Sequence, residues 1–255
     1  MRFAVVISKQ NIAAMNISSF LEGNLPKHLS LHFVEEQVCF ADSAEKIKAD
    51  ALIFASTHTS SSGKPTLSTH CIGNWGKAEL GGKDRQLVPT TAFLLKNYLL
   101  ALQKKKEDLN LQYEVCLEAT HHGPFLGKPT VFIELGSSEK QWRDKQAAEA
   151  VAGVIISSTS VEGGFRPAIA LGGGHYCPEF TKLVLRTDYA LGHICPGYAL
   201  PHLGGEMLSS AIAATKPKPS AIILDWKGLG SEKHRIKSLL EKQDLPIFRV
   251  RKLLG

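Results

Sequence analysis

Apolar residues along the chain follow two periods, one typical of β-strands and one typical of amphipathic α-helices. Short apolar or alternating runs predict strands at residues 3–7, 31–35, 51–56, 115–117, 130–135, 167–171, 221–224 and 247–250. Helical spacing and capping residues predict helices at residues 11–21, 42–49, 90–109, 175–186, 203–215 and 231–242. Another apolar stripe, at residues 148, 151, 152, 155 and 156, predicts a helix that follows residue 138.

Strands that alternate with helices are typical of an α/β fold. We therefore predict a three-layer fold in which a mixed sheet is covered by helices on both faces. Residues 56–82 are rich in Ser, Thr and Gly and are predicted to form one long loop. A loop of this length inside a compact domain is usually functional or disordered, and Leu67, Ile72 and Trp75 argue against disorder.

Two of the predicted strands bring polar side chains to one edge of the sheet. The first leads into His121 and His122, and the second carries Glu134 near its end. Ser138, followed three residues later by Gln141, is typical of a capping box at the start of a helix. Ligands of open α/β sheets bind at such strand ends, and helix N-termini attract anions, so we expect a binding site here.

The adjacent histidines can be arranged in two ways. In an extended chain, the rings of His121 and His122 point to opposite faces, and only one of them reaches the site. A turn at Gly123-Pro124 can instead rotate the other ring toward the site. The sequence leaves this choice open.

A second polar cluster follows the predicted strand at residues 167–171. Gly173 and Gly174 belong to a glycine run that brings the backbone close to another group, for which a phosphate is one candidate. His175 and Tyr176 come directly after this run, and His193 lies before the turn at residues 195–197. Both histidines could equally be hydrogen-bonded core residues.

Imidazole and carboxylate groups are ligands that zinc prefers, and catalytic zinc sites use three protein ligands. The histidines near strand ends and Glu134 are therefore candidate ligands, although their spacing matches no compact motif such as HExxH. No serine lies in a GxSxG motif, so a Ser-His-Asp triad is not favoured.

Composition and charge bear on the class of protein, its location and its binding partners. The chain has 255 residues, of which 44% are hydrophobic and 21% charged, and no apolar run is long enough to span a bilayer. Its five cysteines form no CxxC pair, which favours a reducing, cytoplasmic location. Residues 216–255 contain ten Lys and Arg and four Asp and Glu, so the net charge of +6 lies there. This basic segment is either solvated surface or a patch that follows a phosphate backbone.

Several ordered motifs resemble those of one family, the archaeal and plant type of D-aminoacyl-tRNA deacylase. They are ATHHGP at residues 119–124, FIELGSSEKQW at 132–142, GGGHY at 172–176, the segment 61–75, and Gly192-His193. The resemblance implies hydrolysis of the ester between a D-amino acid and tRNA. It also implies a phosphorylase/hydrolase-like α/β fold with a core similar to peptidyl-tRNA hydrolase, and an association with zinc.

Combining the two lines of inference, we predict a single catalytic domain, residues 1–255, with the basic segment 216–255 at its end. The predicted catalytic residues are His121, His122 and Glu134, and the predicted metal ligands are His175, His193 and Glu134. The predicted substrate-binding residues are His58, His70, Ser137, Ser138, Gly173, Gly174 and Tyr176. The residues predicted to contact tRNA are Lys233, Arg235, Lys237, Arg249 and Arg251.

Two other functions remain open on the sequence alone. A zinc-dependent amidohydrolase or peptidase would use the same histidines on a different substrate. A non-catalytic RNA-binding protein would need only the basic segment. In each case we expect a protein without a membrane segment, more often monomeric than obligately oligomeric.

Overall fold

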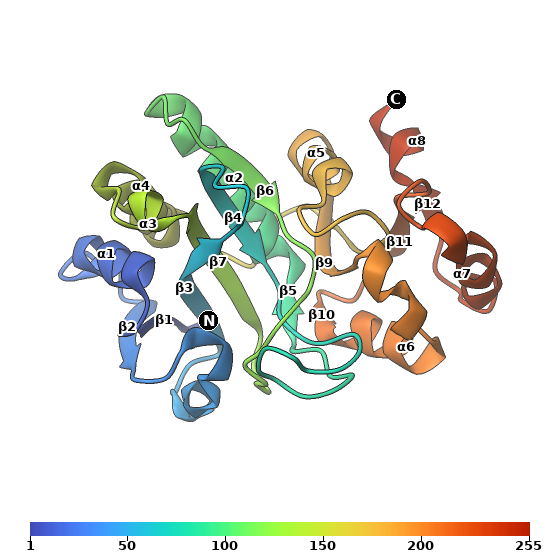
Figure 1. Ribbon diagram of the computed structural model, residues 1–255, viewed down its shortest axis with the longest axis horizontal. Helices are drawn as coiled ribbons and strands as arrows, with labels where there is room; N and C mark the ends of the chain where they lie inside the picture. The colour runs from blue at the N-terminus through green and yellow to red at the C-terminus, as the bar shows by residue number, and fades with distance from the viewer.

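The computed structural model describes all residues from 1 to 255, which form a six-stranded sheet, a four-stranded sheet and a two-stranded ribbon (Figure 1). The strands are β1 (Phe3–Ser8), β2 (Leu29–Val34), β3 (Ala51–Thr59), β4 (Thr66–His70), β5 (Thr90–Thr91), β6 (Glu114–Leu117), β7 (Thr130–Ser137), β8 (Arg166–Leu171), β9 (Tyr189–Cys195), β10 (Thr215–Lys216), β11 (Ala221–Leu224) and β12 (Ile247–Arg249). The α-helices are α1 (Ile12–Leu21), α2 (Ala92–Asp108), α3 (Glu139–Trp142), α4 (Lys145–Ser158), α5 (Pro178–Arg186), α6 (Gly205–Ala214), α7 (Lys233–Leu240) and α8 (Val250–Leu254). The 3-10 helices are η1 (Val38–Phe40), η2 (Asp42–Lys46), η3 (Gly197–His202) and η4 (Gly230–Glu232).

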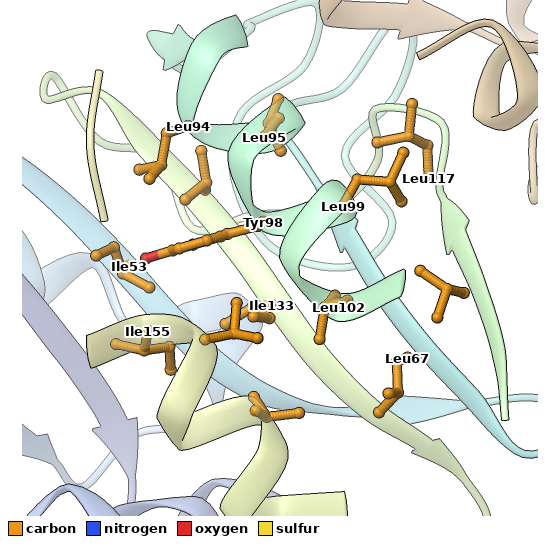
Figure 2. Packing of buried hydrophobic residues seen from close by; sticks show 14 of the residues in the cluster. Ile53, Leu67, Leu94, Leu95, Tyr98, Leu99, Leu102, Leu117, Ile133 and Ile155 are labelled. Carbon is orange, nitrogen blue, oxygen red and sulfur yellow. The ribbon is translucent and has the colours of Figure 1, made fainter. Parts of the chain in front are cut away.

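The larger sheet has the strand order β2-β1-β3-β7-β4-β6, and one of its faces is packed with helices. Val5, Ile53 and Ile133 point to this face and belong to a cluster that includes residues of α1, α2 and α4. Figure 2 shows Tyr98 of α2 and Ile155 of α4 among the packed side chains over this face. Complete burial of each large apolar side chain contributes roughly 1.5–3 kcal/mol, so this layer anchors the sheet.

The opposite face of the larger sheet carries no α-helix. Near the start of the strands it presents an apolar patch covered by 3-10 turns and loops, formed by Ala4, Val6, Leu52, Phe54 and Phe132. Nearer the strand ends the same face becomes polar, with buried Ser8, Ser56, His58 and Glu134. The larger sheet therefore departs from the predicted helices on both faces.

The smaller sheet is all parallel, with the order β12-β11-β8-β9, and helices cover both of its faces as predicted. Ile223 faces the side of α5 and α8, whereas Ile222 packs with residues of α6 and α7. The ribbon of β5 and β10 contacts strands of both sheets. No helix is both long and apolar enough to cross a lipid bilayer.

The prediction of a single loop at residues 56–82 is wrong. β3 continues to Thr59, and β4 inserts between β7 and β6, antiparallel to β7. Thr66, Ser68 and His70 are all buried polar residues of β4, and Leu67 alone joins the apolar core. The strand was missed because its polar positions face a buried polar cluster, so the usual apolar alternation is absent.

Helix starts also differ from the predictions. The helix predicted from His175 begins at Pro178, because Cys177 has a φ of 46° in the left-handed region and cannot belong to a right-handed helix. The capping box of Ser138 and Gln141 is confirmed, although α3 has only four residues. The last predicted strand ends at Arg249, where α8 begins.

Candidate active site

Three neighbouring strands place His58, Glu134 and His70 together on the polar face of the larger sheet. In β3, His58 lies opposite Gly136, two residues along β7 from Glu134. In β4, His70 lies opposite Phe132, two residues before Glu134. Diagonal neighbours of this kind share one face, and the carboxylate of Glu134 lies 3.6 Å from Nδ1 of His58 and 3.6 Å from Nε2 of His70.

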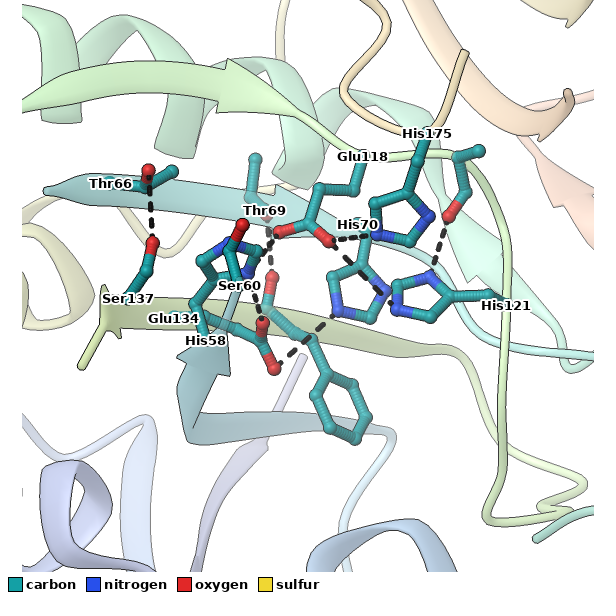
Figure 3. A network of polar contacts seen from close by, with 12 residues as sticks. His58, Ser60, Thr66, Thr69, His70, Glu118, His121, Glu134, Ser137 and His175 are labelled. Carbon is teal, nitrogen blue, oxygen red and sulfur yellow. Dashed lines mark hydrogen bonds and ion pairs between the residues drawn. The ribbon is translucent and has the colours of Figure 1, made fainter. Parts of the chain in front are cut away.

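Glu118 joins the cluster from the end of β6 and is the carboxylate with the most histidine neighbours. It is 1% exposed, and its Oε1 lies 3.0 Å from Nδ1 of His58. Its Oε2 lies 2.8 Å from Nε2 of His175 and 3.9 Å from Nε2 of His121. Figure 3 shows this carboxylate between the three imidazole rings.

The turn after β6 brings both adjacent histidines to the same side. His122 has a φ of 45°, and this left-handed conformation turns its ring toward the site. The ring centroids of His121 and His122 lie 4.4 Å and 5.1 Å from that of His70. The rotated arrangement, which the sequence left open, is therefore the one the structure adopts.

Three of these imidazoles are held in the same way. Nδ1 of His70 lies 3.2 Å from the carbonyl of Cys71, that of His121 lies 2.8 Å from Ala119, and that of His122 lies 2.5 Å from Gly123. Because a carbonyl only accepts hydrogen bonds, Nδ1 must be the donor in each ring. In a neutral ring Nε2 then carries the lone pair that can bind an ion, which is the arrangement of metal-binding histidines.

The two carboxylates are charged at neutral pH. Burial by itself would raise the pKa of Glu118, but hydrogen bonds from His175 and His58 hold it well below its usual range. Burial also raises the pKa of Glu134, but His58 and His70 outweigh burial and leave this pKa below its usual range. Two buried negative charges are thus stabilised by their histidine neighbours.

The histidines divide into two groups by charge. Burial lowers the pKa of His58, but Glu118 and Glu134 outweigh it and raise the value to about 10. The pKa of His70 is raised in the same sense, since Glu134 outweighs burial. Burial, followed by the charge of His70, lowers the pKa of His122 to about 4 and holds that of His121 well below its usual range.

Three sets of side chains could hold a metal ion. In each set, the candidate ligand atoms lie within 4.8 Å of one another. The first set is His70, His121 and His122. The second is Glu118, His121 and His175, and the third is His58, Glu118 and Glu134. Nε2 of His58 and Nε2 of His70 are buried and have no hydrogen-bond partner. Buried, unpaired ring nitrogens beside two carboxylates fit a zinc ion.

The cluster lies in the wall of a cavity of about 520 Å³. His58, Glu118, His121, His122, Glu134 and His175 all line it. Asn11 and Ile12, at the start of α1, and Trp142 form other parts of its wall. A cavity of this size holds a small ligand against the charged residues.

His193 does not join the cluster, although it was predicted to be a metal ligand. It is fully buried, its Nε2 lies 3.0 Å from the carbonyl of Val88, and its Nδ1 lies 3.2 Å from Oγ1 of Thr120 and 3.4 Å from Sγ of Cys71. Burial lowers its pKa to about 4. Both ring nitrogens are already engaged, so the structure favours a hydrogen-bonded core histidine.

Two predicted substrate-binding serines have structural partners instead. Ser137 is buried and donates to the carbonyl of Lys64 at 2.5 Å, while the hydroxyl of Ser138 donates to Oε1 of Gln141 at 2.6 Å. Neither serine lines the cavity. Their hydroxyls therefore fix the end of β7 and the start of α3.

The glycine run packs against protein. A Cβ on Gly228 would lie 2.0 Å from the nitrogen of Gly173, and Gly173 accepts a hydrogen bond of 2.8 Å from the nitrogen of Gly197. Gly173 therefore belongs to a tight contact between turns and not to a phosphate cradle, whereas Gly174 is open. Tyr176 is half-exposed at 38%, and its ring meets that of His58 edge-on at 5.6 Å.

The basic residues near the C-terminus lie on α7, β12 and α8, at the far side of the molecule from α1 (Figure 1). Arg235 donates to the carbonyls of Leu200 and Leu203 and forms an ion pair of 2.5 Å with Glu232. The guanidinium of Arg249 lies 4.0 Å from the ring centre of Trp226. Arg235 therefore makes more contacts within the protein than the other basic residues and is less available to bind tRNA.

Glu118 is the site residue that the sequence-based predictions omitted. It continues the alternation of Glu114 and Cys116 past the end of β6, onto the face opposite the apolar core residues Val115 and Leu117. The sequence does contain a signal for Glu118 as a site residue. It is a carboxylate that lies one residue beyond a strand and three residues before a histidine. From the sequence, this alternation does not distinguish a carboxylate of the site from a solvent-facing strand residue.

The chain is similar to known proteins over most of its length. A family model described as D-aminoacyl-tRNA deacylase matches residues 45–248. A D-aminoacyl-tRNA deacylase of Thermococcus kodakarensis is 44% identical over 207 residues, covering 80% of this chain and 75% of the relative. One of Archaeoglobus fulgidus is 33% identical over 253 residues, covering 91% of this chain and 90% of the relative. The crystal structure of AF0625, a conserved protein of unknown function, is 30% identical, superposes with a TM-score of 0.90, and is matched over 99% of this chain and 96% of its own. The chain therefore belongs to the D-aminoacyl-tRNA deacylase family.

Proposed function

We propose that the protein hydrolyses the ester bond of D-aminoacyl-tRNA and releases the free D-amino acid and tRNA. Family membership supports this reaction, and so does the chemistry of the cavity. The observation that carries the proposal is the convergence of five histidines and two carboxylates at one edge of the sheet, beside a cavity of about 520 Å³. Ester hydrolysis needs an activated water and a group that stabilises the oxyanion, and such a cluster offers both.

Zinc is the proposed cofactor. His70, His121 and His122 would hold it through Nε2, since each Nδ1 donates to a backbone carbonyl. Glu118 and His175 belong to an overlapping set that shares His121. A bound zinc ion supplies Lewis acidity toward the ester oxygen.

His175 is the proposed proton carrier. Its Nε2 lies 2.8 Å from Oε2 of Glu118, so the carboxylate orients the ring. Its side chain is 31% exposed and lines the cavity, which leaves Nδ1 able to accept a proton from water or donate one to the leaving ribose oxygen. His58, protonated between Glu118 and Glu134, would keep the two carboxylates in place.

The basic C-terminal segment is proposed to contact the tRNA backbone. Lys233, Lys237 and Arg251 are the better candidates, because Arg235 bonds backbone carbonyls and Arg249 stacks on Trp226. A cytoplasmic location, a monomeric state and a core similar to peptidyl-tRNA hydrolase remain parts of this proposal.

The test is hydrolysis of D-Tyr-tRNA and L-Tyr-tRNA by purified protein, together with its metal content. We expect release of D-tyrosine, little attack on the L form, loss of activity on chelation and recovery with zinc. Survival of D-Tyr-tRNA and D-Asp-tRNA with excess zinc-loaded protein would contradict the reaction, and peptides or acylated amino acids would be tried next. Binding of tRNA without hydrolysis would favour a non-catalytic RNA-binding protein.

A further inference from the structure

A second cavity, of about 310 Å³, lies on the other side of the adjacent histidines. His121, His122 and Leu80 line both cavities, so these residues form the boundary between them. The other walls of the second cavity come from the segment after β4, residues 73–80, and from η3. A substrate whose reacting bond lies at the two histidines can therefore extend into a cavity on either side.

The walls of this second cavity are fixed by hydrogen bonds. The nitrogen of Gly73 lies 2.8 Å from the carbonyl of His122, and the nitrogen of Arg85 lies 2.7 Å from the carbonyl of Gly76. Nη1 of Arg85 donates to the carbonyl of His202 in η3 at 3.1 Å, which joins the two walls. The cavity is therefore formed before any ligand arrives, and binding does not have to order the loop.

The lining of the second cavity suits a nucleoside. Tyr198 is 63% exposed, which is unusual for a tyrosine beside a buried polar cluster, whereas Trp75, in the wall of the same cavity, is buried. Exposed aromatic rings are platforms on which bases of single-stranded nucleic acid stack. Nδ2 of Asn74 donates to the carbonyls of Gly81 and Lys83, so its amide oxygen remains as a free acceptor. Lys77 and Glu79 are both exposed at the rim, so their opposite charges offset each other.

The residues that line only the larger cavity differ in kind from those of the second cavity. Ile12, Val38 and Trp142 line it alone, beside the polar side chains of Gln10 and Asn11. Such a mixture suits an amino acid with a side chain and an amino group. Its tryptophan, Trp142, is half-buried and its Nε1 donates to the carbonyl of His58, so the larger cavity has no aromatic ring as exposed as that of Tyr198. The two halves of an aminoacyl-nucleoside ester thus find different surroundings on the two sides of His121 and His122.

We propose that the second cavity binds the 3′-terminal nucleoside of tRNA, with its base against Tyr198, while the larger cavity takes the D-aminoacyl group. This assignment rests on the proposed deacylase function, since that reaction places an ester between a nucleoside and an amino acid. The adjacent histidines then face the ester carbonyl from the boundary of the two cavities.

Binding of two short oligonucleotides tests the assignment without requiring catalysis. The probes are the trinucleotide CCA, which mimics the tRNA end, and the dinucleotide CC, which lacks its last nucleoside. We expect the wild-type protein to bind CCA at least about 10-fold more tightly than CC, and Tyr198→Ala to abolish this difference. Tyr198→Phe keeps the ring but loses the hydroxyl that lies 3.4 Å from Nδ1 of His175, so it should retain the preference. Phe33→Ala, which removes an exposed ring from β2 outside both cavities, should retain it too.

Kinetics then separate the nucleoside half from the aminoacyl half. Tyr198→Ala should raise KM for D-Tyr-tRNA about 10-fold or more, whereas the ratio of its rates on different D-amino acid ethyl esters should stay that of the wild type. Equal affinity of the wild type for CCA and CC, or a preference that survives in Tyr198→Ala, would overturn the assignment. An altered preference of Tyr198→Ala among D-amino acid ethyl esters would overturn it too, because it would place the aminoacyl group in this cavity. If the wild type prefers CCA but does not hydrolyse D-Tyr-tRNA, the proposed reaction fails and the nucleoside site stands.

Discussion

Replacing Glu118 with glutamine removes the charge that His58 and His175 share while keeping the size of the side chain. Burial lowers the pKa of His58, but Glu118 and Glu134 outweigh it and raise the pKa from 6.5 to about 10, a net effect of roughly 5 kcal/mol. Removing one partner of a buried charge pair typically costs about 3–5 kcal/mol of stability. In a protein of this size that corresponds to a fall in Tm of roughly 6–20 °C.

Activity should fall as well, for a different reason. His175 loses the carboxylate that orients Nε2 at 2.8 Å, and the overlapping ligand set loses Glu118. Loss of a positioned acid or base typically lowers a rate about 10²–10⁴-fold, so we expect a decrease of at least about 10²-fold in single-turnover hydrolysis of D-Tyr-tRNA.

The matched control is Glu114→Gln, four residues earlier in the same segment, where the carboxylate is exposed and has no ion-pair partner. It should leave Tm and the single-turnover rate close to wild type. The assays are thermal unfolding and single-turnover hydrolysis for both variants, each with and without added zinc. If Glu118→Gln matched Glu114→Gln in both measurements, the central role assigned to Glu118 would be refuted.

Four further results are expected. His193→Ala should lower Tm but keep the single-turnover rate of the protein that remains folded, because both ring nitrogens of His193 bond core groups; a large rate loss at unchanged Tm would return it to the site. Chelator-treated protein should lose stability as pH rises from about 6.5 to 10, since the folded-state pKa of His58, about 10, exceeds its unfolded value. Denaturant midpoints measured across that pH range report this loss of stability, and in His58→Gln the midpoint should depend less on pH. If the midpoints of wild type and His58→Gln changed equally with pH, His58 would not be the group responsible. Lys233→Ala and Arg251→Ala, as single variants, should each reduce the magnitude of the slope of log K for tRNA binding against log salt concentration by about 0.7–0.9. Arg235→Ala should instead lower stability by about 1–2 kcal/mol, because its donors bond backbone carbonyls.

Most strands and helices could be predicted from local sequence. β1 and β11 are buried on both sides, so nearly every residue in them is apolar, and the first parts of β3 and β7 share this pattern. The capping box at Ser138 and the Asn11 cap of α1 depend only on residues a few positions apart. β4 escaped prediction because its burial is among polar groups, and that leaves no apolar period.

The site was predicted only in part, for a related reason. His121, His122, Glu134, His58, His70 and His175 were all among the predicted functional residues, and the structure brings them together. Glu118 was omitted, and His193, Ser137, Ser138 and Gly173 were included although their side chains or backbone contact other parts of the fold. Residue type and position near a strand end were enough to suggest candidates but not to separate them.

The sequence by itself determined the α/β class, the main elements, the basic C-terminal segment and the kinds of side chain available for chemistry. These depend on period, composition and short-range contacts, which are local properties of the chain. Tertiary structure alone decided that β4 inserts antiparallel beside β7, which makes His58 and His70 the diagonal neighbours of Glu134. It also decided that the left-handed backbone at His122 turns its ring toward His70, and that His193 faces Val88. Strand order and ring direction depend on contacts between residues far apart in the chain, and no local pattern records which of several histidines will meet a given carboxylate.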